Sequence, residues 1–314
     1  MKKHKILLIG YSNIAKKRYI KFFLKKKIQF SVASKSYKKK IRNAYQQYSN
    51  YDDAITNSGA NIAYISLPNS LHFHWAKKAL LNGYHVVVDK PISNNLYETN
   101  ELIIIAKKKN KLISEATFYD YHNQIKQVKN ILKKDKLKFI KAEFIIPLPS
   151  KNSLLMSKNF KGGVIMDMGP YASSLHRIFF NKKIISAKVV IKNNIKKLPV
   201  SFKIDVNYKN QNFSGLFKFG GKYKNEVIFS TKQKTISIQR VFSPPDDLDL
   251  NIKMIDKNNN KIENIKVSKD NCFKNFFIEL LKKIDQKRNS FYFNRIKQDH
   301  LFREKIEKKF LNII

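Results

Sequence analysis

The stretch that decides the fold is residues 84–91, which read Tyr-His-Val-Val-Val-Asp-Lys-Pro. This apolar, β-branched run between Gly83 and Pro91 predicts a strand buried on both faces, as strands of a parallel sheet are. In open α/β sheets the ligand crevice lies beyond the carboxyl ends of the strands, so we expect Asp89 and Lys90 to project into it. Proline has a fixed φ and no N–H, so Pro91 ends the strand and fixes the direction in which Lys90 leaves it. Lys90 is therefore a candidate acid or base.

Residues 5–9 predict a first strand that runs into a glycine turn and a helix, the context of a dinucleotide-binding fingerprint. Gly10 and Ala15 match the pattern GxGxxG/A, whereas Ser12 stands where the second glycine lets the backbone approach a pyrophosphate. Serine is small, and its hydroxyl could itself meet a phosphate. The predicted cofactor-binding residues of this turn are Gly10, Ser12, Asn13 and Ile14.

A second strand is predicted over residues 29–34, and its end is informative about the cofactor. Proteins that prefer NAD usually carry an acid there for the ribose 2′-hydroxyl. This chain has Ser34 and Lys35 instead, with Lys38, Lys39 and Lys40 behind them. A hydroxyl and lysines suit a 2′-phosphate, so the sequence favours NADP, although lysines carry less weight in so lysine-rich a chain.

Residues 61–67 predict a third strand, followed by a helix that Asn69 or Ser70 can cap. Pro68 and Asn69, at the strand end, are well placed to line a nicotinamide. His72 is interpreted as a helix-surface or capping residue, and Trp75 as a packing anchor. A further helix over 95–109 and a fifth strand over 111–116 complete the alternation of strands and helices that is typical of a doubly wound parallel sheet.

The second half of the chain predicts a different sheet. Apolar and polar residues alternate in several of its strands, which suits an antiparallel sheet with one open face. Asp167, Tyr171 and His176 lie on a helix after the first of these strands, and a wide apolar stripe over 273–284 is interpreted as core. The predicted strands are 139–148, 185–192, 202–208, 213–219, 226–231, 235–241 and 251–256.

Composition limits the remaining possibilities. The 314 residues are enough for two domains, and 43% hydrophobic residues indicate a folded chain. The net charge of +40 would suit a nucleic acid or an anionic membrane, but lysines are spread through every segment, which we interpret as a lysine-favouring coding background. The single cysteine, Cys272, excludes an intramolecular disulfide, no spacing suggests a metal site, and no apolar run is long enough for a signal peptide or a membrane span. We therefore expect a cytoplasmic protein that binds neither nucleic acid nor membrane.

Five features, in this order, carry a family resemblance: the turn at residues 10–15, Leu67-Pro68-Asn69 with His72, Asp89-Lys90-Pro91, Glu115-Ala116, and Gly162-Gly163 leading to Asp167 and Tyr171. Together they resemble the Gfo/Idh/MocA family of glucose–fructose oxidoreductase and inositol dehydrogenase-like enzymes. The chain differs from the usual pattern at Asp89, where the family has glutamate, at Ser12, and at Tyr171, where many members have histidine. Tyr171 is similar to the dihydrodiol dehydrogenase-type branch.

The resemblance implies an N-terminal Rossmann domain over residues 1–118 and a C-terminal α+β domain over residues 119–314. The second domain would carry an open, mainly antiparallel sheet that often forms the interface of a dimer or tetramer. The implied cofactor is NADP or NAD. To the turn and strand-end residues above, the resemblance adds the cofactor-binding positions Leu67, Pro68, Asn69, His72, Asp89, Lys90 and Glu115.

The implied activity is oxidation or reduction of a secondary hydroxyl or keto group of a sugar, an inositol or a nucleotide-linked sugar. Such a reaction needs a group that takes or gives the hydroxyl proton. We expect Lys90 and Tyr171 to share this proton relay and Asp167 to orient the substrate hydroxyls. Singly, Asp167 could be a first-turn helix acid and Tyr171 a packing residue. The alternatives are a catalytically silent dinucleotide-binding regulatory or scaffold protein and, ranked last, a nucleic-acid binder suggested by charge alone.

Overall fold

The computed structural model describes residues 4–37, 39–193 and 198–311, with the side chains described up to residue 308. Lys38, one of the lysines expected near a 2′-phosphate, lies outside the described residues. The chain forms two compact units, each described here by itself. The first comprises Met1–Thr117, Asn159–Lys161 and Phe276–His300, and the second comprises Phe118–Lys158, Gly162–Asn275 and Leu301–Ile314.

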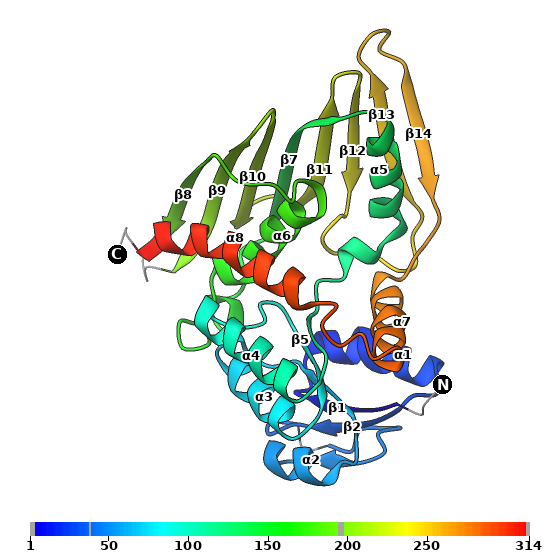
Figure 1. Cartoon of the computed structure of the whole chain (residues 1–314), viewed down its shortest axis with the longest axis vertical. Helices are drawn as coiled ribbons and strands as arrows, with labels where there is room; N and C mark the ends of the chain where they lie inside the picture. Colours follow the sequence, from blue (N-terminus) through cyan, green and yellow to red (C-terminus); the bar gives the residue numbers. More distant parts are fainter. Residues whose placement is uncertain (1–3, 38, 194–197, 312–314) are drawn as a thin grey trace. The chain divides into compact units, whose positions relative to one another are not determined.

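The first unit contains the predicted parallel sheet, of which β1, β2 and β5 are labelled in Figure 1. Its strands follow the order β3-β2-β1-β4-β5-β6. This 3-2-1-4-5-6 order is that of the doubly wound dinucleotide-binding fold. Its central strands are fully buried, as their unbroken apolar runs predict. The strands are β1 (Lys5–Ile9), β2 (Gln29–Ala33), β3 (Gln47–Tyr48), β4 (Ile62–Ile65), β5 (His85–Val88) and β6 (Ile113–Glu115).

Helices connect these strands, and their starts have local causes. Asn50 accepts the N–H of Asp52 at 2.7 Å before α2, and Asn95 accepts the N–H of Glu98 at 2.9 Å before α4. Both satisfy helix N–H groups that lack intrahelical partners. The first helix begins with a π-helical turn, a wider winding that is frequent at functional sites. The segments are η1 (Ala15–Tyr19), α1 (Ile20–Lys25), α2 (Tyr51–Asn57), α3 (Asn69–Leu81) and α4 (Leu96–Lys108).

Helix α7 (Cys272–Asp285) returns to the first unit from the far end of the sequence. The ring of Phe277 lies 5.5 Å from that of Phe22, 5.3 Å from that of Phe23 and 6.0 Å from that of Tyr64, between centroids. This confirms that the apolar stripe of the helix is core. The boundary predicted between residues 118 and 119 did not include this C-terminal segment in the first unit. That boundary stays a proposal for the division into a cofactor-binding and a substrate-binding domain. Helix α8 (Phe293–Leu311) follows.

The second unit carries the mainly antiparallel sheet, in the order β14-β13-β12-β11-β7-β10-β9-β8 (Figure 1). Its neighbouring strands are antiparallel except β7 and β10. The strands are β7 (Leu137–Ile146), β8 (Ser186–Asn193), β9 (Pro199–Tyr208), β10 (Gln211–Phe219), β11 (Lys224–Thr231), β12 (Lys234–Gln239), β13 (Leu250–Asp256) and β14 (Ile262–Val267), with η2 (Tyr119–Tyr121), α5 (Asn123–Lys134), η3 (Leu154–Met156) and α6 (Val164–Phe179) as the helices.

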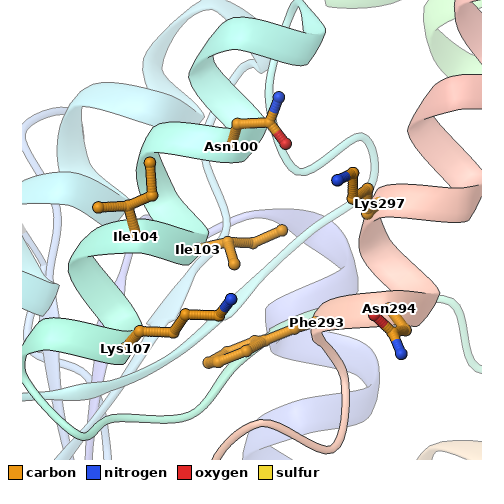
Figure 2. Close-up of a pocket in the computed structure, with 7 residues that line it drawn as sticks. All are labelled: Asn100, Ile103, Ile104, Lys107, Phe293, Asn294 and Lys297. Carbon is orange, nitrogen blue, oxygen red and sulfur yellow. The ribbon is translucent and has the colours of Figure 1, made fainter.

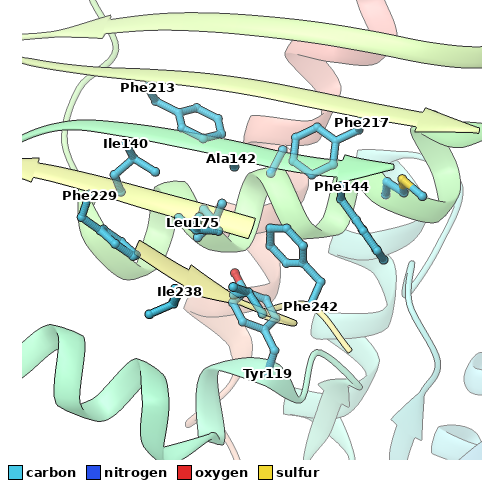
Figure 3. Packing of buried hydrophobic residues seen from close by; sticks show 14 of the residues in the cluster. Tyr119, Ile140, Ala142, Phe144, Leu175, Phe213, Phe217, Phe229, Ile238 and Phe242 are labelled. Carbon is cyan, nitrogen blue, oxygen red and sulfur yellow. The ribbon is translucent and has the colours of Figure 1, made fainter. Parts of the chain in front are cut away.

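One face of this sheet is packed and the other is open. On the packed face, Phe202 and Phe217 stack at 4.8 Å and are fully buried, and Figure 3 shows Leu175 of α6 among the sheet residues. Alternate residues, such as Lys203 and Asp205, lie on the other face and form an ion pair at 3.2 Å. The alternation seen in the sequence therefore corresponds to an inside and an outside, as predicted.

Candidate active site

The carboxyl ends of three neighbouring strands bring Gly10, Ser66 and Asp89 together. Ile9 of β1 pairs with Ile65 of β4, and Ile65 pairs with Val88 of β5, so the residues that follow them are neighbours. Gly10 has φ +99°, and a Cβ at this position would overlap the carbonyl oxygen of Ser66. Only glycine fits here, for reasons of both conformation and space.

The carboxylate of Asp89 accepts three hydroxyl hydrogen bonds. Tyr19 and Tyr64 donate to Oδ1 at 2.7 and 2.8 Å, and Ser66 donates to Oδ2 at 2.6 Å. Burial, together with the charge of Asp89, raises the pKa of both tyrosines well above the usual value, so both remain protonated donors. No sequence pattern predicted the roles of Tyr19, Tyr64 and Ser66. A tyrosine within an otherwise apolar buried strand was the available signal, because a buried phenol needs a partner.

Ser12 faces the same cluster of hydroxyl groups. Its Oγ lies 2.7 Å from Oγ of Ser66 and accepts the N–H of Ala15 at 3.1 Å, in the i to i+3 pattern of helix capping. Ser12, which stands where the fingerprint has its second glycine, therefore stabilises the turn through these two hydrogen bonds. Asn13 and Ile14, the next two predicted residues, are exposed.

The backbone around Lys90 is held on both sides. His72, which is fully buried, has Nδ1 2.6 Å from the carbonyl oxygen of Pro91 and Nε2 2.7 Å from that of Leu67. Glu115 accepts the N–H of Ile92 at 2.8 Å, and the Lys90–Pro91 peptide bond is cis. The interpretation of His72 as a surface residue is thus wrong: the helix turns this side chain inward, where it joins the loop before α3 to the loop after β5.

At the end of β2, Ser34 is buried and its Oγ accepts the N–H of Tyr37 at 3.2 Å. The ammonium of Lys35 lies 5.1 Å from the ring centroid of Tyr51 and 5.9 Å from that of Trp75. These are cation–π distances, and they confirm that the buried Trp75 is a packing residue.

A second lysine lies beside the glycine turn. The ammonium of Lys16 lies 4.6 Å from the ring of Tyr11 and 5.0 Å from the ring of Tyr37. The sequence analysis did not single out Lys16, because its position on the aromatic pair depends on how the turn and the segment after β2 fold together.

Asn69, the first residue of α3, donates from Nδ2 to the carbonyl oxygen of Lys161 at 3.0 Å, and Pro68 precedes it in extended geometry. Leu67 lies against Gly10, since its Cδ2 is among the atoms nearest to the place that a Cβ of Gly10 would take. The predicted residues of this segment thus lie at the same sheet edge as the glycine turn.

Asp167 and Tyr171 lie one turn apart on α6, in the second unit. The helix begins after Gly163, which has φ +97°, and Asp167 is in its first turn, where a negative charge is favourable. The ring of Tyr171 packs 5.0 Å from that of Phe242 and 5.4 Å from that of Phe144. Because Lys90 belongs to the first unit, a joint role of the three residues stays a prediction.

Comparison with known proteins identifies the family. Residues 4–117 match the oxidoreductase family with an NAD-binding Rossmann fold, Gfo/Idh/MocA. Residues 4–117 are therefore similar to the NAD-binding domain of the Gfo/Idh/MocA family. This match confirms the resemblance found in the sequence and agrees with the parallel sheet of the first unit.

Two oxidoreductases of known activity resemble the chain over part of its length. The dTDP-3,4-didehydro-2,6-dideoxy-alpha-D-glucose 3-reductase of Actinomadura kijaniata is 23% identical over 200 residues, which is 62% of this chain and 60% of that protein. The D-xylose 1-dehydrogenase (NADP(+)) 2 of Haloferax volcanii is 26% identical over 135 residues, 42% of each chain. The alignments with these relatives thus span less than two thirds of their length.

Solved structures of the Gfo/Idh/MocA fold match nearly the whole chain. The 3-ketoreductase KijD10 from Actinomadura kijaniata, in complex with NADP and TDP-benzene, gives a TM-score of 0.86 at 18% identity and covers 95% of both chains. The UDP-N-acetylglucosamine 3-dehydrogenase GnnA from Acidithiobacillus ferrooxidans gives 0.77 at 14% identity, covering 99% of this chain and 100% of that one. Both confirm the two-sheet fold.

A groove elsewhere in the first unit contains none of the predicted site residues. It has a volume of about 400 Å³ and lies between α4 and the start of α8, where Lys107 and Lys297 flank an apolar floor (Figure 2). Within the described residues, no group of three or more His, Cys, Asp or Glu side chains could hold a metal ion. No described helix is both long and apolar enough to cross a membrane.

Proposed function

We propose that this chain is an NADP-dependent oxidoreductase that acts on a secondary hydroxyl or keto group of a sugar, and in particular of a nucleotide-linked sugar. The observation that carries the proposal is the placement of Lys90 at the carboxyl edge of the parallel sheet, on a loop held by His72 and Glu115. A proton-transfer group must be fixed to within a fraction of an ångström, and this loop has the required support.

The residues at the sheet edge fit a dinucleotide. Gly10 leaves the space that a Cβ would fill, and a helix starts directly after the turn, so backbone N–H groups face a pyrophosphate. No acid follows β2, whereas Lys35 and Lys16 lie near its end and beside the turn. Both would be favourable beside a 2′-phosphate, which supports NADP over NAD. The cofactor would supply or accept the hydride.

The substrate class is supported by the named activities of the relatives. Two of them act on dTDP-linked or UDP-linked sugars at C3, and one is a D-xylose dehydrogenase. In our proposal Lys90 gives a proton to the substrate oxygen during reduction or takes it during oxidation. Tyr171 shares this proton, and Asp167 accepts hydrogen bonds from the sugar hydroxyls.

The proposal includes two further expectations from the sequence. The open face of the antiparallel sheet would form the interface of a dimer or tetramer, as the family resemblance implies. The protein would act in the cytoplasm, which is consistent with a sequence that has one cysteine, Cys272, and so cannot form an intramolecular disulfide.

The test is a fluorescence titration with NADPH and NADH, followed by a screen of sugars and of dTDP-linked and UDP-linked sugars. We expect tighter binding of NADPH than of NADH, and we expect Lys90→Ala to lower turnover by about 1,000-fold at saturating NADPH. Lys108→Ala, an exposed lysine on α4, is the matched control and should retain turnover. Binding without turnover of any sugar would indicate the silent dinucleotide-binding alternative, and failure to bind either cofactor would refute the proposal.

The preference for NADPH has its own test. Lys35→Ala and Lys16→Ala should each weaken NADPH binding by about tenfold while leaving NADH binding nearly unchanged, because only NADPH carries the 2′-phosphate. Equal losses for both cofactors would mean that these lysines contact another part of the dinucleotide.

A further inference from the structure

The hydrogen bonds of three side chains at the sheet edge can run in only one direction. Ser66 donates its single hydroxyl proton to Asp89, so towards Ser12 its oxygen can only accept. Ser12 must then donate to Ser66, while its own oxygen accepts the N–H of Ala15. A directed chain therefore runs from the helix start through Ser12 and Ser66 to the carboxylate beside Lys90; we name Ser12, Ser66 and Asp89 the hydroxyl chain.

The acceptor end of the hydroxyl chain is fixed by its surroundings. Tyr19, at the end of the π-helical turn, and Tyr64 occupy the other carboxylate oxygen of Asp89. The ring of Tyr64 in turn stacks on Phe277 of α7 with an interplanar angle of 16°. Asp89 thus has donors on both oxygens, and two of these donors are set by the packing of buried rings.

We propose that Asp89 is a positioning residue which, through Ser66 and Ser12, sets the conformation of the dinucleotide-binding turn and thereby couples cofactor binding to the orientation of Lys90. This inference rests on the proposed function. It also joins two departures from the family pattern, Ser12 and Asp89, in one structural unit. The serine hydroxyl replaces the freedom of a glycine with a hydrogen bond to Ser66, which in turn donates to Asp89, the residue before Lys90.

The test is a double-mutant cycle read by NADPH affinity, which needs no identified substrate. Ser12→Ala should weaken binding about fivefold and Asp89→Asn about tenfold. Because both act through the same hydroxyl chain, the double variant should lose only about tenfold, whereas independent effects would multiply to about fiftyfold. Ser12→Thr keeps the hydroxyl and should recover most of the NADPH affinity that Ser12→Ala loses.

The control and the stability measurement separate positioning from general damage. Ser114→Ala removes a buried hydroxyl outside the hydroxyl chain, so its effect should multiply with that of Asp89→Asn. Thermal unfolding should show only a slightly lower melting temperature for Ser12→Ala than for Ser12→Thr, because a lost helix cap costs about 1 kcal/mol. If Asp89→Asn does not fold, Ser66→Ala takes its place in the cycle, since it interrupts the hydroxyl chain while keeping both ends.

Two results would overturn the inference while leaving the proposed function intact. One is unchanged or tighter NADPH binding by Ser12→Ala, and the other is a double variant whose loss is the product of the single losses. If the unaltered protein binds neither NADPH nor NADH, the proposed function fails, and this inference fails with it.

Discussion

The two sheets hold their carboxylates in opposite ways. At the edge of the parallel sheet, Asp89 is surrounded by three hydroxyl donors on rigid or buried elements. On the open face of the antiparallel sheet, Glu143 pairs with Lys224 at 2.6 Å and Lys141 at 3.5 Å. Burial alone would raise the pKa of Glu143, but the two lysines lower it below its usual value.

The two carboxylates differ in how strictly their partners fix them: Asp89 accepts directional hydrogen bonds, whereas Glu143 forms ion pairs that depend little on direction. Hydroxyl donors fix the position of a carboxylate because each has one proton and one favourable geometry. Lysine side chains on a surface adjust to their partner, and salt screens the pairs. The candidate site at the parallel sheet therefore has side chains in fixed positions, while the open face of the other sheet has ion pairs whose geometry can vary. Three predictions test this contrast.

The largest effect is expected at Gly10. Gly10→Ala would force a side chain into the carbonyl of Ser66 at a positive φ, so we expect a loss of about 5 kcal/mol in the free energy of unfolding, or failure to fold. Gly59→Ala is the matched control. It also has a positive φ, +59°, but no atom lies within 4 Å of its Cβ, so only about 1 kcal/mol should be lost. Urea unfolding of both variants measures this, and equal losses would show that the close approach to Ser66 is unimportant.

A smaller loss is expected inside the antiparallel sheet. Phe217→Ala leaves a cavity beside Phe202 on the packed face and should cost about 4 kcal/mol. The adjacent Leu216 lies on the open face, so Leu216→Ala should cost about 1 kcal/mol or less. Similar losses in urea unfolding would contradict the assignment of an inside and an outside, or would show that the open face is covered by another subunit.

The smallest expected effect is a dependence of the free energy of unfolding on pH, to which His85 in the first unit and His176 in the second contribute. Burial, with nearby positive charges, lowers the pKa of His85 in the first unit and of His176 in the second to about 4. Between pH 6.5 and pH 4 these histidines bind protons in the unfolded chain but stay neutral in the folded chain. Their contribution to the free energy of unfolding is therefore fully present above pH 6.5 and is lost as the pH falls towards 4. We expect roughly 2 kcal/mol per histidine once solvent screening is allowed for.

The substitutions His85→Asn and His176→Asn check this dependence. Each keeps an acceptor without a titrating group: Nδ1 of His85 accepts the N–H of Leu112 at 3.0 Å, and Nδ1 of His176 lies 2.7 Å from the hydroxyl of Tyr208. Urea unfolding between pH 4 and 7 should show a flatter curve for each variant. A curve identical to that of the unaltered protein would mean that the histidine does not control stability in this range.

Local patterns predicted most of the fold. Unbroken apolar runs gave the buried parallel strands, and alternation gave the open antiparallel sheet, because burial on two faces or on one leaves a different period in the sequence. Two strands were missed. Strand β3 has only two residues, and β14, at the end of its sheet, is largely exposed and has little apolar pattern.

The candidate site could be predicted only in part, because motifs report sequence neighbours and not partners in space. Asp89 and Lys90 followed from the end of a strand. The donors to Asp89 come from residues 19, 64 and 66, and no short-range pattern joins them. His72 is a second example of partners that the sequence does not show. Its position in the helix suggested a surface residue, whereas its contacts with the carbonyls of Leu67 and Pro91 depend on how the two loops pack.

The return of α7 to the first unit has a consequence for the order of folding during synthesis. Phe277 covers the rings of Phe22, Phe23 and Tyr64, so the N-terminal unit cannot close its core until the last part of the chain has been made. A nascent chain that ends near residue 118 would have all six parallel strands but would expose these rings to water. We therefore expect the N-terminal unit to begin folding first and to complete its core only after the strands of the second sheet have been synthesised.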